Sequence, residues 1–323
     1  MNTILAVGEL VAGTPTRLTL ELATLARTLA DAAGVDAEIL LAGPEAAAAA
    51  AAVAAHGPAV RVLPDDPDPA LHAGPLAARV ATDLAAGTAR WVLLPATPAG
   101  RAVAGALAGA AGIAVLSGAT AVTWADGAPR VTQAPWGGRI VTESTFAGGP
   151  GAIVVRPGAI AAGAAATPGA IATVVGSTAG GPAPVVVERR AAATADRPIE
   201  EARIVVGAGR GVAGPDGVAL LGRLADALGG SLGATRAAVD SGWIDYARQI
   251  GQTGRSVKPD LYLACGVSGA IQHKVGVQTA GTIVAINRDA DAPIAEFSDL
   301  LVVGDLFAIV PALIDALAAD DRG

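Results

Sequence analysis

The sequence lacks several residue types on which common classes of protein depend. Cys265 is the single cysteine, which excludes a disulfide framework and a cysteine-based metal site. The three histidines, His56, His72 and His273, lie far apart in sequence and lack the spacing of metal ligands. The net charge is −7, whereas a nucleic-acid-binding protein is expected to present a basic face. We therefore expect no metal site and no nucleic-acid partner.

Long hydrophobic runs are missing as well, although the chain is apolar overall. Hydrophobic residues make up 52% of the 323 residues and aromatic residues only 3%, so the apolar character comes from alanine and valine. The best candidate runs, 46–55 and 102–116, fall short of the roughly 20 residues that a membrane-spanning helix needs. The amino-terminal stretch has no basic region and includes Glu9, unlike a secretory signal. These features predict a cytoplasmic protein without membrane insertion.

The first half of the chain contains an alternation of short apolar runs and longer helical patterns. Thr14 and Pro15 are typical of a helix start, and a stripe of leucines from Leu18 to Leu29 leads to a stop at Gly34. Such alternation predicts a parallel sheet covered by helices. The predicted strands are 3–8, 37–42, 60–63 and 91–95.

The pattern changes after about residue 117. Short segments rich in threonine, valine and isoleucine, with turn signals at Asp126-Gly127 and Gly137-Gly138, predict antiparallel strands that end with 153–155. Beyond them we expect, in order, an extended crossing or loop at 157–183, a strand at 185–188 and a hinge at 196–198. The first domain is therefore predicted to span 1–195 and to serve as a scaffold that contacts a partner.

A second alternation starts after residue 202 and predicts a second domain, 196–323. A helix with apolar residues from Val218 to Leu228 is closed by Gly229-Gly230, and a last helix covers 306–317. The fold class is thus α/β, with two nucleotide-binding-type parallel-sheet domains in series and a doubly wound sheet in the C-terminal one. The predicted strands of this domain are 203–206, 231–234, 261–265, 282–286 and 300–303.

A glycine cluster follows the first strand of the second domain. Gly207, Gly209 and Gly211 would let the backbone approach a phosphate with free amide groups, and Arg210 adds a cation that suits pyrophosphate. The spacing is not the GxGxxG fingerprint, because position 212 is valine. A plain tight turn is the alternative interpretation.

Two further motifs flank the strand predicted at 261–265. In Gly251-Gln252-Thr253-Gly254, two glycines enclose an amide and a hydroxyl, so the loop could approach a flat ring and offer it hydrogen bonds. After the strand, Ser268 is a suitable N-cap for a helix that carries His273, and the free amides of that helix would point out of the sheet edge. The alternatives are a simple turn and a structural histidine.

Four more polar residues follow predicted strands, namely Thr235, Arg236, Asn287 and Asp305. Each alone could be a cap or a solvated charge. Their common position at the carboxyl ends of strands of one sheet, where α/β folds bind ligands, predicts a dinucleotide crevice.

These motifs resemble the FAD-binding domain of the electron transfer flavoprotein alpha subunit. The resemblance rests on GAGRG, GATRAAVDSGW, QIGQTGR, KPDLYLACGVSGAIQH, GTIVAINRDADAPI and GDLFAIVPALI, in this order and with similar separations. It covers roughly 203–317, and SGAIQH followed by AINRDADAPI is a highly specific combination. Residues 1–195 resemble the subunit's N-terminal domain only in layout and in fragments such as LELATLAR.

The resemblance implies the FAD-binding subunit of a heterodimeric electron carrier without substrate chemistry of its own. Its partner would be the electron transfer flavoprotein beta subunit, which would bind AMP. Electrons would come from flavin dehydrogenases such as the acyl-CoA dehydrogenases of fatty acid beta-oxidation. They would pass to a quinone reductase through an anionic semiquinone.

The resemblance also assigns residues to the cofactor. Arg210 and Thr235 would bind the pyrophosphate, with Thr235 where the family more often has serine. Arg236 would lie against the isoalloxazine, Thr253 would donate to flavin N5, and His273 would face the N1 and C2 carbonyl edge. The other implied cofactor residues are Ile250, Gly251, Gln252 and Gly254 in the loop, Ser268, Gly269, Ala270, Ile271 and Gln272 in a cradle, and Asn287, Asp305 and Leu306 at the adenosine.

These residue types suit a one-electron carrier. An anionic semiquinone concentrates negative charge near N1 and the C2 carbonyl, so a cation there favours it. Arg236 and His273 are expected to supply that positive potential. Paired carboxylates, a Ser-His-Asp set and a reactive thiol do not accompany them, and Cys265 is interpreted as a core residue.

Three alternatives stay open. An NAD-binding enzyme could use the same sheet, and a structural partner could carry a degenerate site. An electron-bifurcating carrier would differ mainly in the beta subunit, which would hold a second FAD in place of AMP, although the GQTG loop resembles the simple carriers more.

Overall fold

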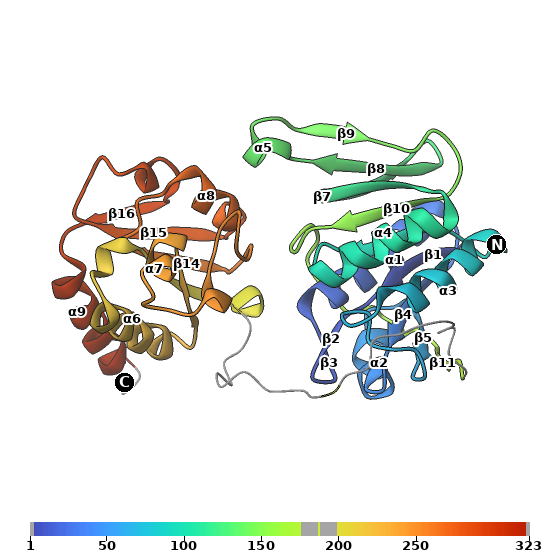
Figure 1. Cartoon of the computed structure of the whole chain (residues 1–323), viewed down its shortest axis with the longest axis horizontal. Helices are drawn as coiled ribbons and strands as arrows, with labels where there is room; N and C mark the ends of the chain where they lie inside the picture. The colour runs from blue at the N-terminus through green and yellow to red at the C-terminus, as the bar shows by residue number, and fades with distance from the viewer. Residues whose placement is uncertain (1–2, 176–186, 188–198, 321–323) are drawn as a thin grey trace. The chain divides into compact units, whose positions relative to one another are not determined.

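A computed structural model of the chain describes residues 3–175, 187 and 199–320. The chain divides into two compact units, Met1–Arg189 and Arg190–Gly323, and each contains its own parallel sheet (Figure 1). The predicted α/β class with a parallel sheet in each half is therefore confirmed. The predicted boundary at residue 195, the hinge at 196–198 and, apart from Val187, the strand at 185–188 lie outside the described residues.

The sheet of the first unit has nine strands, and a small hairpin lies outside it. The strands are β1 (Thr3–Val7), β4 (Ala37–Ala42), β5 (Ala59–Leu63), β6 (Ala89–Pro95), β7 (Ala114–Ala125), β8 (Ala128–Gln133), β9 (Thr142–Ser144), β10 (Gly151–Val155) and β11 (Ile171–Thr173), with β2 (Leu10–Val11) and β3 (Thr14–Pro15) in the hairpin. The order is β11-β5-β4-β1-β6-β10-β7-β8-β9. Pairing is parallel from β11 to β7 and antiparallel from β7 to β9.

Helices cover both faces of this sheet. They are α1 (Arg17–Ala33), α2 (Ala46–Ala54), α3 (Ala73–Ala85) and α4 (Pro98–Ala111), and a short α5 (Pro135–Gly138) follows β8. Ile4 and Ala6 of β1 belong to the core with α1 and α2, while Leu5 and Val7 belong to the core with α3 and α4. Successive side chains of a strand point to opposite faces, so a strand covered on both sides is apolar throughout.

The start of α1 differs from the sequence prediction. Thr14 and Pro15 do not cap the helix, because they pair with β2 as strand β3. Thr16 is the N-cap instead, and its hydroxyl accepts a hydrogen bond from the N–H of Thr19 at 3.1 Å. The predicted stop is confirmed, since Gly34 ends the helix in the left-handed conformation.

Two strands of the first unit were also predicted wrongly. The prediction of antiparallel strands holds for β8 and β9 but is wrong for β10, which runs parallel between β6 and β7. Every residue of β10 is buried, as is usual for an interior parallel strand. Within the predicted loop at 157–183, Ile171–Thr173 forms β11 beside β5.

The second unit contains a five-stranded, wholly parallel sheet. Its elements are η1 (Ile199–Glu201), β12 (Ile204–Ala208), η2 (Arg210–Val212), α6 (Pro215–Ala227), β13 (Ser231–Ala234), α7 (Arg236–Asp240), η3 (Tyr246–Arg248), β14 (Leu261–Cys265), α8 (Ile271–Val277), β15 (Thr282–Asn287), η4 (Pro293–Phe297), β16 (Leu300–Val303) and α9 (Leu306–Asp320). The order is β13-β12-β14-β15-β16. One core joins the sheet to α6, α7 and α9, and a second joins it to α8 and η4 (Figure 1).

Arg61 joins three elements of the first unit through ion pairs. Its guanidinium on β5 contacts both carboxylate oxygens of Glu38 on β4, and it lies 2.9 Å from Asp83 Oδ2 on α3. The three side chains are 17%, 24% and 17% exposed. Replacing Arg61 by leucine leaves two half-buried carboxylates without this cation, so we expect the free energy of unfolding to fall by about 2 kcal/mol. Urea unfolding followed by circular dichroism measures the change.

The substitution Arg130→Leu is the matched control. Arg130 also pairs with two carboxylates, but Asp126 and Glu143 are 80% and 63% exposed. Exposed ion pairs contribute little, so we expect a change below about 0.5 kcal/mol. Equal losses in the two variants would contradict the role of Arg61 as a half-buried crosslink.

Candidate functional site

The candidate site lies at the carboxyl edge of the sheet in the second unit. After β12 the chain passes through α6 to β13 on one side, and β14 then pairs with β12 on the other side. Doubly wound sheets bind ligands where the strand order reverses in this way. The loops that follow β12 and β14 therefore define the site, with those after β13, β15 and β16 beside them.

The loops after β12 and β14 touch each other through their backbones. The N–H of Gly209 donates to the Cys265 carbonyl at 2.9 Å, and the N–H of Gly211 donates to the Gly266 carbonyl at 3.0 Å. A Cβ atom at position 209 would lie 2.1 Å from the Gly266 oxygen, so only glycine allows this approach. Arg210, between the two glycines, is exposed. The predicted glycine cluster thus presents a guanidinium at the point where the strand order reverses.

Thr235 and Arg236 follow β13 and lie beside this loop. The N–H of Thr235 donates to the Ala208 carbonyl at 2.9 Å, which fixes the threonine next to the end of β12. Its hydroxyl is buried and has no hydrogen-bond partner among the described residues. Arg236 is 67% exposed and pairs with the exposed carboxylate of Asp240, at 3.1 Å. A buried hydroxyl without a partner fits a polar ligand group at this edge.

The polar loop at 250–254 rests on the segment that contains His273. The N–H of Gln252 donates to the Gln272 carbonyl at 2.7 Å. Gly251 has φ of +135°, and a Cβ atom there would lie 2.8 Å from that carbonyl oxygen. Ile250 is buried, whereas Gln252 and Thr253 are exposed. The structure therefore brings the second and third predicted motifs together, with the amide and hydroxyl side chains of the loop accessible.

The segment at 268–273 is built differently from the prediction. Helix α8 begins at Ile271 with Ala270 as N-cap, so the prediction of Ser268 as N-cap is wrong. The reason is a turn at Gly269, with φ of +85°, in which the Ser268 carbonyl accepts from the N–H of Ile294 at 3.0 Å. Four residues of the segment are exposed, namely Ser268, Ala270, Ile271 and Gln272.

His273 is buried, and both of its ring nitrogens have partners. Nδ1 lies 3.2 Å from the Ile250 carbonyl, which can only accept, so Nδ1 carries the proton. Nε2 then accepts from the Tyr262 hydroxyl at 2.8 Å. Burial lowers the pKa of His273 to about 4, against the smaller opposing effect of the Ile250 hydrogen bond. Burial therefore disfavours the positive charge that was expected on His273.

The predicted adenosine residues lie after β15 and β16. Asn287 Nδ2 donates to the Val267 carbonyl at 2.9 Å, which ties the end of β15 to the loop after β14. Asp305 accepts from the N–H of Phe307 at 3.0 Å, and this bond, together with the Arg288 guanidinium, lowers the pKa of the Asp305 carboxyl. Leu306 is buried. Asn287 therefore fixes one site loop, whereas Asp305 caps the start of α9.

Two residues at the site were not found from the sequence. Tyr262 is fully buried in β14 and bonds to His273, and Gln249 is 2% exposed and donates to the Thr253 hydroxyl at 3.0 Å. Tyr262 is a polar residue within an apolar run, which is a weak signal for a buried hydrogen bond, whereas Gln249 follows Arg248 in a polar stretch and has no such signal. Their partners are 11 and 4 residues away in sequence, and only the folded loops bring them together.

At the carboxyl edge of the first unit's sheet, side chains of the protein itself fill the position where a ligand would usually bind. Glu9, after β1, accepts from the hydroxyl of Thr97, which caps α4 after β6. Burial raises the pKa of Glu9, although the hydrogen bonds from Thr97 and Gly100 oppose this effect. The strand order of the first unit reverses between β1 and β6, so a side chain of the protein itself bridges the usual ligand position.

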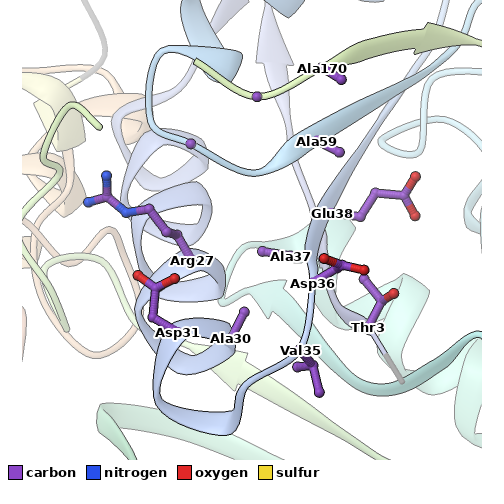
Figure 2. Close-up of a pocket in the computed structure, with 12 residues that line it drawn as sticks. Thr3, Arg27, Ala30, Asp31, Val35, Asp36, Ala37, Glu38, Ala59 and Ala170 are labelled. Carbon is purple, nitrogen blue, oxygen red and sulfur yellow. The ribbon is translucent and has the colours of Figure 1, made fainter. Parts of the chain in front are cut away.

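A cavity of about 480 Å³ opens at the opposite edge of the first unit, near the amino ends of β1, β4 and β5. Figure 2 shows Arg27 and Asp31 on the helix side of this cavity and Asp36 and Glu38 on the strand side. Glu38 is already paired with Arg61. The lining thus mixes both signs of charge at an edge where parallel sheets do not usually bind ligands.

Neither a metal site nor a membrane-spanning helix is found within residues 3–175 and 199–320. No group of three histidine, cysteine or acidic side chains in these ranges is placed to hold a metal ion. No helix in the same ranges combines the length and the apolar character needed to cross a bilayer.

Family models match both units of the chain. The model of the electron transfer flavoprotein domain matches residues 4–193. The model of the electron transfer flavoprotein FAD-binding domain matches residues 198–278, which include the loops after β12, β13 and β14. The cofactor that the family model names is therefore FAD, as the sequence resemblance implies.

Curated relatives agree with these models. The electron transfer flavoprotein subunit alpha of Mycobacterium leprae is 40% identical over 229 residues, which is 71% of each chain. The subunit alpha of Thermoanaerobacterium thermosaccharolyticum is 56% identical over 119 residues, 37% of this chain and 36% of that relative. The Bacillus subtilis subunit is 50% identical over 129 residues, 40% of each chain. Because one family model spans more than half of the sequence and the M. leprae relative matches over 71% of it, the chain belongs to the electron transfer flavoprotein alpha subunit family.

Proposed function

We propose that this chain is the FAD-holding subunit of a two-subunit electron carrier. The observation that carries the proposal is the buried Thr235 hydroxyl, for which the described residues provide no hydrogen-bond partner, at an edge that also presents the Gly209–Gly211 backbone and two exposed arginines. These groups match the parts of FAD: a pyrophosphate for Arg210 and Thr235, and a ring for Arg236. Bound FAD supplies the uptake and release of electrons, and the chain itself transforms no substrate.

In this proposal each site residue contacts or positions a particular group of FAD. Arg210 and the Thr235 hydroxyl bind the pyrophosphate, Arg236 lies against the isoalloxazine, and Thr253 donates a hydrogen bond to flavin N5. The Ser268–Gln272 segment, exposed except at Gly269, forms the cradle, with the Ile250–Gly254 loop beside it. Asn287, Asp305 and Leu306 hold the adenosine side.

The proposed role of His273 differs from the expected one, which was a positive charge beside the flavin ring. Its imidazole is neutral, and a hydrogen bond to the C2 carbonyl edge would require Tyr262 or Ile250 to give up a ring nitrogen. We therefore assign the positive charge near the ring to Arg236 alone among the proposed ring contacts. His273 supports the site by joining β14 to the loop at Ile250.

The proposal includes three partners. An electron transfer flavoprotein beta subunit that binds AMP completes the carrier, acyl-CoA dehydrogenase-type flavoproteins deliver electrons, and a quinone reductase accepts them one at a time. The family assignment of both units supports a two-subunit carrier of this kind. The first unit, through the predicted 1–195 domain, provides the scaffold and partner contacts.

Co-purification with the partner subunit tests this function. The expected complex is yellow and contains one FAD and one AMP per heterodimer, and acyl-CoA dehydrogenase reduces it. A colourless complex that NAD(H) but not FAD protects against thermal unfolding would instead support a nicotinamide enzyme. Two FAD and no AMP would indicate a bifurcating carrier.

Arg236→Ala is expected to change electron uptake more than cofactor affinity. The guanidinium is 67% exposed and its partner Asp240 is 61% exposed, so it can turn toward a bound ring at little cost. Its loss should lower the equilibrium constant for uptake of the first electron about tenfold, which is about 59 mV in a one-electron titration. Potentiometry of the FAD-loaded complex measures the shift.

Arg223→Ala is the control for this prediction. Arg223 is an exposed arginine on α6, outside the proposed site, so its removal changes the net charge by the same amount. The potential of this variant should equal that of the wild type. A shift of the same size in both variants would show a general charge effect and refute the assigned role of Arg236.

A further inference from the structure

Gln249 lies beneath the loop that carries Thr253 and is fixed on both sides. Its side chain is 2% exposed. The backbone N–H of Gln249 donates to the Tyr246 carbonyl at 2.9 Å, and the backbone carbonyl of Gln249 accepts from the N–H of Arg255 at 2.8 Å. A Cβ atom at Gly254 would lie 2.9 Å from Gln249 Cγ, so the loop is packed directly on this side chain. The side-chain amide of Gln249 is therefore held beneath the loop.

The amide of Gln249 determines how the hydroxyl of Thr253 can bond. Gln249 Nε2 donates to Thr253 Oγ1 at 3.0 Å. An amide nitrogen offers only hydrogens, so the hydroxyl oxygen accepts this bond and keeps its own proton for another partner. The Thr253 carbonyl is occupied too, because the Tyr246 hydroxyl donates to it at 2.7 Å. Since Thr253 is exposed, its free hydroxyl proton is available to a ligand.

A hydrogen-bond acceptor in place of the Gln249 amide nitrogen would remove the donor character of the Thr253 hydroxyl. An acceptor beneath Thr253 would take the hydroxyl proton, and the oxygen could then only accept from a ligand. The donor character of Thr253 therefore comes from its buried neighbour. We propose that Gln249 is a positioning residue that holds the Thr253 hydroxyl as a hydrogen-bond donor toward the flavin, an inference that rests on the proposed function.

This inference predicts an effect on electron uptake. A donor beside a flavin nitrogen withdraws electron density from the ring and favours its reduction. One hydrogen bond contributes about 1 kcal/mol, so releasing the hydroxyl should lower the equilibrium constant for the first electron about fivefold. At 59 mV for each tenfold change, the shift is about 40 mV toward lower potential.

The test uses the FAD-loaded complex and variants of both residues. Gln249→Leu removes the amide at similar volume, Thr253→Val removes the hydroxyl while keeping the branched shape, and the double variant removes both. Each single variant should show the fivefold effect, and the double variant should show no more than Thr253→Val, because Gln249 acts only through Thr253. Gln133→Leu removes an amide in the first unit that donates to the Ser117 carbonyl and accepts from the Ser144 hydroxyl, and it should leave the potential unchanged.

A second measurement reports the hydrogen bond itself. In complexes with FAD labelled with ¹⁵N at N5, the N5 resonance responds to a donor at that atom, which a purely structural role of Gln249 would not provide. Gln249→Leu and Gln249→Glu should both move this resonance toward its position in Thr253→Val, since the glutamate carboxylate takes the hydroxyl proton. A Gln249→Glu resonance at the wild-type position would overturn the inference.

The outcomes separate this inference from the proposed function. A wild-type complex that binds no FAD would refute the proposed function. A complex in which Thr253→Val shifts the potential while Gln249→Leu does not would leave that function intact and overturn the role of Gln249. Should Gln249→Leu fail to fold, Gln249→Met takes its place, because its unbranched side chain keeps the length of glutamine.

Discussion

Gly209→Ala is expected to destabilise the second unit by about 3 kcal/mol and to lower FAD affinity at least about tenfold. The new Cβ atom would lie 2.1 Å from the Gly266 oxygen, 2.4 Å from the Gly266 carbonyl carbon and 2.5 Å from Val267 Cα. All three atoms belong to the backbone, so no side chain can rotate away. The loops after β12 and β14 must separate, and the hydrogen bonds of Gly209 and Gly211 weaken.

Urea unfolding and FAD titration measure the two effects of this substitution. Gly222→Ala is the matched control, because Gly222 lies within α6 and a Cβ atom there meets nothing within 4 Å. Alanine is the better helix former, so this variant should gain about 0.5 to 1 kcal/mol. A loss in Gly222→Ala, or wild-type stability in Gly209→Ala, would contradict the close approach of the two loops.

His273 is expected to make the stability of the second unit strongly dependent on pH. In the unfolded chain a histidine takes up a proton below its ordinary pKa of 6.5, whereas burial keeps His273 neutral down to about pH 4. Unfolding therefore takes up a proton between these values, and stability is lost as the pH falls through the window. With about 1.4 kcal/mol for each pH unit, the loss approaches about 3 kcal/mol at pH 4.

A comparison with His273→Gln isolates this contribution. The free energy of unfolding is measured at pH 7, 5.5 and 4.5 for both proteins, and the difference between them cancels the titration of the carboxylates. The variant is less stable at pH 7, because the bonds to Tyr262 and Ile250 are weakened, and the gap narrows as the pH falls. A gap that stays constant from pH 7 to 4.5 would contradict a neutral, buried imidazole.

The strands could be predicted from the sequence because burial on both faces leaves uninterrupted apolar runs. Leu261–Cys265 and Ala37–Ala42 have the predicted bounds for this reason. The start of α1 could not be predicted in the same way. Thr14 and Thr16 are both suitable caps, and the choice depends on the pairing of Thr14 with Val11 across a hairpin.

The position of the candidate residues at one sheet edge was predictable, but their side-chain interactions were only partly so. Thr235 and Asn287 were expected at the edge because each follows a strand, and strand ends of a parallel sheet meet at one edge. The charge of His273 depends on how deeply other segments of the chain bury it. The local sequence pattern does not indicate this burial. The same holds for Gln249, whose effect on Thr253 exists only in the folded loop.

The place of β10 in the first unit has a consequence for synthesis on the ribosome. This strand comes late in the unit, yet it lies between β6 and β7, which precede it in the chain. Until residues 151–155 have emerged, β6 and β7 both lack β10, the strand that lies between them. One edge of each strand therefore stays open to other chains. A nascent first unit therefore joins the two parts of its sheet only after those residues appear, whereas the sheet of the second unit adds β14, β15 and β16 outward in the order of synthesis.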